Sequence, residues 1–219
     1  MTSAGFDIKD NILSSAECDE LISLLADVRR GRAGARNLMK FGFVSKLASD
    51  SRLLRLTELI YGRELVPYKA TLFEKTGKAN WLVAWHQDTA LPIEKFVASG
   101  GWSAPSMKAG TLFAQAPSSE LKRILALRIH LDGSTETNGP LRVIPGSHSR
   151  GILADEIMKE LVSGSEPIQC LVGRGGVIAM SPLLLHSSSK IVSNEPRRVV
   201  HIEYAESLDL GEGMKLAIA

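Results

Sequence analysis

From residue 66 onward the apolar residues come in short runs, and this feature limits the possible folds more than any other. The predicted strands are 66–73, 82–86, 124–131, 141–144, 176–180 and 197–204. Clusters of Gly, Pro, Ser and Asn separate them, as is typical of turns between short strands. Many short strands in one chain favour a double-sheet jelly roll or a barrel.

The first third of the chain is predicted to be helical. Ser14 and Glu17 have the spacing of a capping box, and the apolar residues that follow recur at helical intervals. A second helix is expected over about 52–61, with Ser49 or Asp50 as its cap. Helices followed by many short strands predict an α+β, mainly β chain, in which a jelly roll carries helices packed outside it.

We expect a single domain over 1–219, in which 1–65 is mainly helical support and 66–204 is the jelly-roll core. Within the core, 89–121 is rich in Gly, Pro and Ser and shows little periodicity. Segments of this length inside a compact domain are usually functional or disordered, and the apolar residues here favour a functional lid. One more helix is expected around 153–162.

Composition and charge exclude several classes of protein. The net charge of +2 requires neither a nucleic acid nor an anionic membrane as partner, and the basic run 29–32 is expected to be a solvated loop. No stretch approaches the roughly 20 apolar residues of a membrane span. Cys18 and Cys170 are far apart and suggest a reduced setting. We therefore expect a soluble, cytoplasmic protein, with its oligomeric state left open.

The strongest functional signal lies in the segment 80–88, which contains an H-x-D pattern. On an extended segment, side chains two apart point the same way, so His86 and Asp88 can share one metal ion. The pattern alone is common by chance. A facial triad needs a further histidine and leaves the opposite face of the metal open. The candidates for it are His130, His148, His186 and His201.

His186 is the strongest of these candidates. It follows the apolar run 177–185, which places it at the end of a predicted buried strand. Arg197 comes eleven residues later, at the start of another predicted strand. A guanidinium group can bind a carboxylate through two parallel hydrogen bonds, which a lysine cannot match. The combination is much more specific than any part of it, and it predicts a metal site at His86, Asp88 and His186.

With these residues in place, the sequence resembles the phytanoyl-CoA dioxygenase family of iron(II)- and 2-oxoglutarate-dependent oxygenases. The matching motifs are WHQD at 85–88, NGPLRVIPGSH at 138–148 and LLLHSSS…RR at 183–198, in the family's order. The match extends over roughly 71–204. The resemblance implies a cupin-like double-stranded β-helix that uses iron(II), 2-oxoglutarate and O2.

The resemblance also assigns roles to single residues. It implies that His86, Asp88 and His186 are the iron ligands and the catalytic residues. Arg197 would bind the distal carboxylate of 2-oxoglutarate, and Ser188 would assist it. A further contact is expected from the strand before WHQD, from Thr71, Phe73 or Lys75, with Thr71 as the candidate that we carry forward.

The substrate pocket is less constrained by the sequence. Arg128 lies in an apolar predicted strand, and an arginine there is costly to bury unless it is paired. It either meets Asp132 or Glu203 or faces the cavity and holds an acidic substrate. Trp102, in the lid segment, is a second candidate substrate residue. His201 shares a face with the arginine at 197 and is expected to be a hydrogen-bonded core histidine.

The predicted function is oxidation of a small molecule, most simply hydroxylation, with release of succinate and CO2. Asp88 favours hydroxylation over halogenation, because related halogenases lack this carboxylate; desaturation, epoxidation and ring closure stay open. One alternative is a catalytically silent jelly-roll binding protein, which would be expected to have lost a ligand or Arg197. Another is a zinc-dependent hydrolase, which would need a general base beside the metal. The sequence does not identify the substrate.

Overall fold

The computed structural model describes residues 2–31, 34–77 and 79–219. Arg32, the last residue of the basic run 29–32, therefore lies outside the described residues. Within the described part, Arg29 is exposed, as expected of a solvated loop. Arg30 instead donates to backbone carbonyls at the end of the first helix, including Val28 O at 2.6 Å, and its Nε lies 3.0 Å from a carboxylate oxygen of Glu74.

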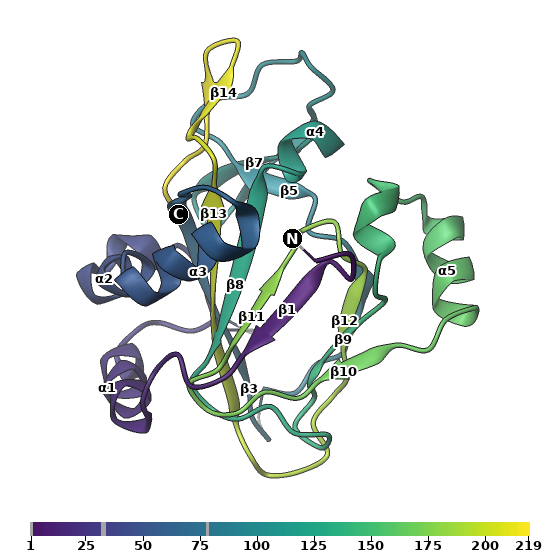
Figure 1. The fold of residues 1–219 in the computed structure, drawn as a ribbon. Coiled ribbons are helices and arrows are strands. Elements are labelled where there is room, and N and C mark those ends of the chain that lie inside the picture. The colour runs from purple at the N-terminus through teal and green to yellow at the C-terminus, as the bar shows by residue number, and fades with distance from the viewer. Residues whose placement is uncertain (1, 32–33, 78) are drawn as a thin grey trace.

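Two antiparallel sheets form the core, and they face each other in Figure 1. The larger sheet has the order β1-β11-β8-β13-β3-β2, and the smaller one β10-β9-β12-β4. The strands of the larger sheet are β1 (Phe6–Lys9), β2 (Gly34–Ala35), β3 (Val66–Lys75), β8 (Ile124–His130), β11 (Val177–Met180) and β13 (Arg197–Ala205). Those of the smaller sheet are β4 (Val83–His86), β9 (Leu141–Val143), β10 (Ile168–Cys170) and β12 (His186–Ser188). Each of the six predicted strands overlaps an observed one, and the mainly β jelly-roll fold is confirmed.

The residues of β8 show how the larger sheet divides the core. Leu125, Leu127 and Ile129 pack into the apolar cluster that includes the N-terminal helices. Ala126 belongs to a second cluster, shared by the two sheets. Because successive side chains of a strand point to opposite faces, Arg128 lies on the same face as Ala126 and projects into the space between the sheets.

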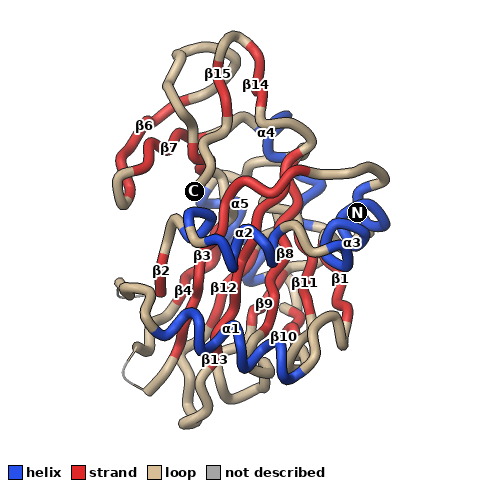
Figure 2. The backbone as a smooth tube through the Cα atoms, turned by 90° about the vertical axis from the view of Figure 1, so that its left-hand side faces the viewer, coloured by secondary structure: helices blue, strands red, loops and turns tan. Residues whose placement is uncertain are grey.

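Three helices cover the outer face of the larger sheet, as Figure 2 shows. They are α1 (Ser15–Ala26), α2 (Gly42–Ala48) and α3 (Ser51–Tyr61), and short 3₁₀ turns lie at η1 (Leu38–Lys40) and η2 (Ser147–Arg150). The predicted capping box is confirmed, since Ser14 and Glu17 each accept a hydrogen bond from the other's backbone N–H. Of the two proposed caps for α3, Asp50 is the one observed, and it accepts from Arg52 N at 2.9 Å.

The segment 89–121 is folded into regular elements that its weak periodicity did not reveal. It contains β5 (Ala90–Pro92), β6 (Ser103–Lys108), β7 (Thr111–Gln115) and α4 (Ser118–Leu121), with the strands in a separate sheet of order β5-β7-β6. The hairpin β14 (Asp209–Gly211) and β15 (Met214–Lys215) lies at the same end of the molecule (Figure 1). The strands within 89–121 are short, so the hydropathy of this segment shows no clear strand period.

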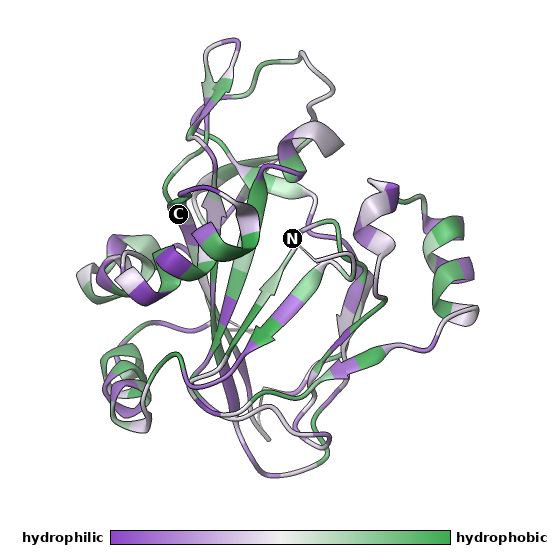
Figure 3. Cartoon of the chain, viewed as in Figure 1, coloured by the Kyte–Doolittle hydropathy of each residue, from purple (hydrophilic) through white to green (hydrophobic). Residues whose placement is uncertain are grey.

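The helix expected around 153–162 is observed as α5 (Asp155–Ser163). Its apolar residues, coloured green in Figure 3, are not buried, and Ile157 is 40% exposed. One local expectation was wrong: the run 177–185 is not one strand, because β11 ends at Met180 and a turn leads to His186, which begins β12 in the other sheet. The turn is itself buried, so the apolar run hides it. No helix in the described ranges is both long and apolar enough to cross a membrane.

Candidate metal centre

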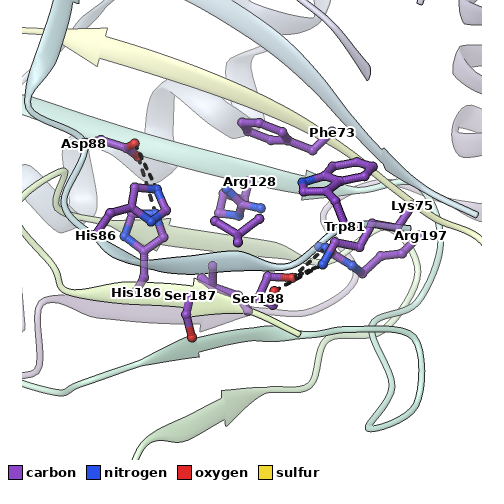
Figure 4. A pocket seen from close by; sticks show the side chains of 12 residues that line it. Phe73, Lys75, Trp81, His86, Asp88, Arg128, His186, Ser187, Ser188 and Arg197 are labelled. Carbon is purple, nitrogen blue, oxygen red and sulfur yellow. Dashed lines mark hydrogen bonds and ion pairs between the residues drawn. The ribbon is translucent and has the colours of Figure 1, made fainter. Parts of the chain in front are cut away.

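Two neighbouring strands of the smaller sheet bring three potential metal ligands together. His86 ends β4, Asp88 follows two residues later, and His186 begins β12 directly opposite His86 in the antiparallel pairing. Both histidine Nε2 atoms lie 3.6 Å from carboxylate oxygens of Asp88, and one ligand atom from each residue lies within 4.8 Å of the others (Figure 4). The predicted triad is therefore assembled in a geometry that could hold one metal ion.

Backbone carbonyls fix the orientation of both imidazole rings. His86 Nδ1 donates to Ala84 O at 2.8 Å, and His186 Nδ1 donates to Leu184 O at the same distance. With the proton on Nδ1, the lone pair of each Nε2 points toward Asp88 and is free to bind a metal. Burial lowers the pKa of His186 to about 4, even though Asp88 opposes the shift. The ring is thus neutral near pH 7, as a metal ligand must be.

The triad forms one end of a cavity whose other end is basic. That end is built by Lys75 on β3, Arg197 on β13 and Ser188 on β12. Lys75 and Arg197 are directly opposite in the β3–β13 pairing, and both donate to Ser188 Oγ, at 2.7 and 3.1 Å. Phe73 and Trp81 contribute aromatic walls between the two ends (Figure 4).

The basic end lacks a counter-charge. Arg197 is 2% exposed, and its Nε and Nη1 have no hydrogen-bond partner among the described residues. Burial, and then Arg128, lowers the pKa of Arg197 to about 9, while burial, Arg197 and Arg128 lower that of Lys75 to about 7. Two buried cations side by side are unfavourable unless an anion joins them. The orphaned guanidinium N–H groups therefore fit a carboxylate, which guanidinium binds in a bidentate way.

Arg128 also lines the cavity, and neither protein carboxylate considered for it is its partner. Asp132 pairs with Arg198 instead, at 2.7 Å. Glu203 pairs with Lys69 at 2.6 Å. Of the two interpretations left open by the sequence, the structure supports the one in which Arg128 faces the cavity.

The remaining candidates are placed as follows. Thr71 is buried but lines a neighbouring hollow with basic side chains, whereas the alternatives Phe73 and Lys75 line the cavity itself. Trp102 packs in a separate apolar cluster near the three-stranded sheet and does not line the cavity. His201 is a buried, hydrogen-bonded histidine, 3.2 Å from Glu203, as expected.

Trp81, in the informative segment 80–88, was interpreted from the sequence as core or lid packing that could also wall the substrate pocket, and it lines the cavity. Its ring is 5.6 Å from Lys75 Nζ, so it forms a cation–π contact at the basic end. A tryptophan five residues before the first histidine of H-x-D carries no period or motif that would mark it. Only the return of the chain from β3 to β4 brings it over the lysine.

Comparison with known proteins places these features in a family. The profile of the phytanoyl-CoA dioxygenase (PhyH) family matches residues 2–199. The chain is 24% identical to an ectoine dioxygenase of Bordetella bronchiseptica, over 91% of this chain and 71% of that protein. It is 27% identical to an L-proline trans-4-hydroxylase of Streptomyces griseoviridis, over 73% of this chain and 62% of the hydroxylase.

A solved structure with the same fold is that of EctD from S. alaskensis with 2-oxoglutarate and 5-hydroxyectoine. The two structures superpose with a TM-score of 0.68 at 21% identity, over 93% of this chain and 72% of EctD. At this identity the likeness establishes the fold, and it agrees with the cupin-like double-stranded β-helix expected above.

Proposed function

The chain belongs to the phytanoyl-CoA dioxygenase family, and from that premise we propose which of its residues hold the cofactors. The protein is an iron(II)- and 2-oxoglutarate-dependent dioxygenase that oxidises a small molecule. His86, Asp88 and His186 bind the iron, and they are its catalytic residues. Arg197 and Ser188 bind the distal carboxylate of 2-oxoglutarate. Lys75, and not Thr71, provides the contact with 2-oxoglutarate that is expected from the strand before WHQD.

One observation carries this assignment: a three-ligand metal site and a buried, unpaired guanidinium group lie at opposite ends of one cavity. A dicarboxylate that also chelates the metal fits such a pocket at both ends. A zinc-dependent hydrolase would need a general base, yet Asp88 is the only carboxylate among the described residues that line the cavity. A silent binding protein would have no need to retain all four groups.

The residues of the chain act by binding, orienting and excluding water. When bound, iron(II) and 2-oxoglutarate supply the activation of oxygen and the oxidising power, with succinate and CO2 as co-products. The carbonyls of Ala84 and Leu184 hold the imidazole rings toward the metal position. The side chains of Val83 and Leu141 join the aromatic walls, and these apolar side chains limit the access of water between the two polar ends of the cavity.

We propose hydroxylation as the outcome, and the similarity to an L-proline trans-4-hydroxylase supports it. That protein and the ectoine dioxygenase are named for small substrates, which supports a small molecule here too. The buried free thiols of Cys18 and Cys170 favour a reducing compartment, so we propose the cytoplasm. The net charge of +2 favours neither a nucleic acid nor a membrane as partner.

The proposed function is tested by an anaerobic titration. Metal-free protein receives one equivalent of iron(II), then 2-oxoglutarate, while the visible charge-transfer absorption of the chelate is recorded. We expect a saturable band that requires both additions. If neither the metal nor 2-oxoglutarate binds, the oxygenase assignment is wrong and a silent jelly roll is the better account.

The lowered pKa of Lys75 predicts that the protein takes up a proton when 2-oxoglutarate binds. Its pKa of about 7 in the free pocket leaves it roughly nine-tenths neutral at pH 8. A bound carboxylate favours the charged amine and raises this pKa, so affinity falls as pH rises from 7 to 8, while below pH 6 no proton is taken up. Calorimetry of the Mn(II)-loaded protein in two buffers of different ionisation enthalpy measures the uptake.

The matched variant for this measurement is Lys75→Met, which keeps most of the volume and removes the charge. The other charged groups that face Lys75 are Arg197 on β13 and Arg128 on β8, and both stay protonated between pH 6 and 8. The variant is therefore expected to bind 2-oxoglutarate without proton uptake in this window. Undiminished uptake in Lys75→Met would assign the proton to another group.

A further inference from the structure

Arg128 is a buried cation that forms no ion pair with a carboxylate of the described residues, although the charge of Asp88 acts on it across the cavity. It is 6% exposed, and its Nε has no hydrogen-bond partner among them. Its one hydrogen-bond contact among the described residues is with a buried imidazole, Nη1 lying 3.3 Å from His201 Nδ1. Burial lowers the pKa of Arg128, and this cost remains until an anion arrives. A guanidinium left in this state beside a ligand cavity indicates that the ligand supplies the anion.

The fold places Arg128 between the two ends of the cavity. Figure 4 shows its side chain between the His86/His186 pair and the Lys75/Arg197 pair, and it lines the same cavity as all four. Side chains of β13 and β3, the next two strands on one side of β8, restrain its position. Its guanidinium lies 5.2 Å from the centre of the Phe73 ring, and His201, directly opposite on β13, contacts it.

A count of charges shows which anion is missing. The described residues lining the cavity include three cationic side chains, Lys75, Arg128 and Arg197, and one carboxylate, Asp88. Asp88 belongs to the metal site. The distal carboxylate of 2-oxoglutarate provides one negative charge at the end where Lys75 and Arg197 already share Ser188 Oγ. The other carboxylate of 2-oxoglutarate would carry the second negative charge, and Arg128 is the one cation left for it among the described residues that line the cavity.

We propose that Arg128 binds the metal-chelating carboxylate of 2-oxoglutarate, so that separate cations hold the two ends of the co-substrate. This inference rests on the proposed function. It makes Arg128 a positioning and specificity residue, whose guanidinium would hold this carboxylate and set its orientation. An acidic group on the primary substrate has the same chemistry, and the experiment separates the two sources.

The test uses two keto acids under anaerobic conditions. 2-Oxoglutarate has both carboxylates, whereas 2-oxopentanoate has the chelating carboxylate and lacks the distal one. Dissociation constants come from the charge-transfer band of the iron(II)-loaded protein, with metal content measured separately. Arg128→Met is expected to weaken both keto acids by a similar factor, roughly 10- to 100-fold. Arg197→Met, the matched control, is expected to weaken 2-oxoglutarate and leave 2-oxopentanoate unchanged.

Each outcome decides the inference. If Arg128→Met leaves both dissociation constants within about twofold of the original, the inference fails and the anion belongs to the primary substrate. If Arg128→Met weakens 2-oxoglutarate alone, Arg128 acts at the distal end and the inference fails too. A wild-type protein without the band overturns the proposed function itself. Should Arg128→Met not fold, Arg128→Lys keeps the charge but loses the fork geometry, and it is expected to weaken both keto acids less strongly.

Discussion

Replacing His186 by alanine is expected to abolish iron(II) binding at the cavity and to reduce oxygen-dependent consumption of 2-oxoglutarate to background. Loss of a group that only supports a metal ligand typically costs 10- to 100-fold in metal affinity or activity. Removal of a ligand itself should therefore weaken iron(II) by at least about 100-fold. The residue is 3% exposed and its ring is fixed by Leu184 O, and the described residues offer no metal-ligating cluster at this site other than His86, Asp88 and His186.

The informative comparison is His201→Gln, because His201 was the leading alternative ligand in the sequence. It is buried near the same cavity, but its nitrogens meet Glu203 and Arg128 rather than the triad. His201→Gln is expected to keep one equivalent of iron(II), measured by metal analysis after gel filtration, while His186→Ala keeps none. If His201→Gln loses the metal and His186→Ala retains it, the ligand set is wrong.

The triad was accessible from the sequence because its signals are local. His86 and Asp88 are two residues apart on an extended segment, and this spacing alone puts them on one side. His186 was chosen partly for a reason that the structure corrects: it begins a strand after a buried turn and does not end one. The structure nevertheless brings His186 beside His86 and Asp88.

The basic residues of the cavity could not be placed in the same way, because their neighbours depend on register. Lys75 meets Arg197 only through the pairing of β3 with β13, which are distant in sequence. A shift of one residue would turn every side chain of β3 to the other face, and nothing local specifies that register. For the same reason the ion pairs of Asp132 and Glu203, which leave Arg128 free, were not foreseeable.

Arg197→Ala is expected to weaken 2-oxoglutarate binding by roughly 10- to 150-fold. The estimate follows from about 1.5–3 kcal/mol for a hydrogen bond to a charged group. Because the defect lies in binding the co-substrate, raising its concentration should recover much of the rate. Anaerobic titration gives the dissociation constant, and steady-state kinetics give KM and kcat for 2-oxoglutarate separately.

The adjacent residue supplies the control, because Arg197 and Arg198 alternate across β13. Arg197 points into the cavity, whereas Arg198 donates two hydrogen bonds to Asp132, at 2.7 and 2.8 Å. Arg198→Ala is therefore expected to leave the dissociation constant of 2-oxoglutarate unchanged and to lower the free energy of unfolding by about 1 kcal/mol, measured in urea. Equal weakening of 2-oxoglutarate by both substitutions would mean a general effect of positive charge on β13 and no specific clamp. A defect confined to Arg197→Ala assigns the binding of the distal carboxylate to one side chain on one face of β13.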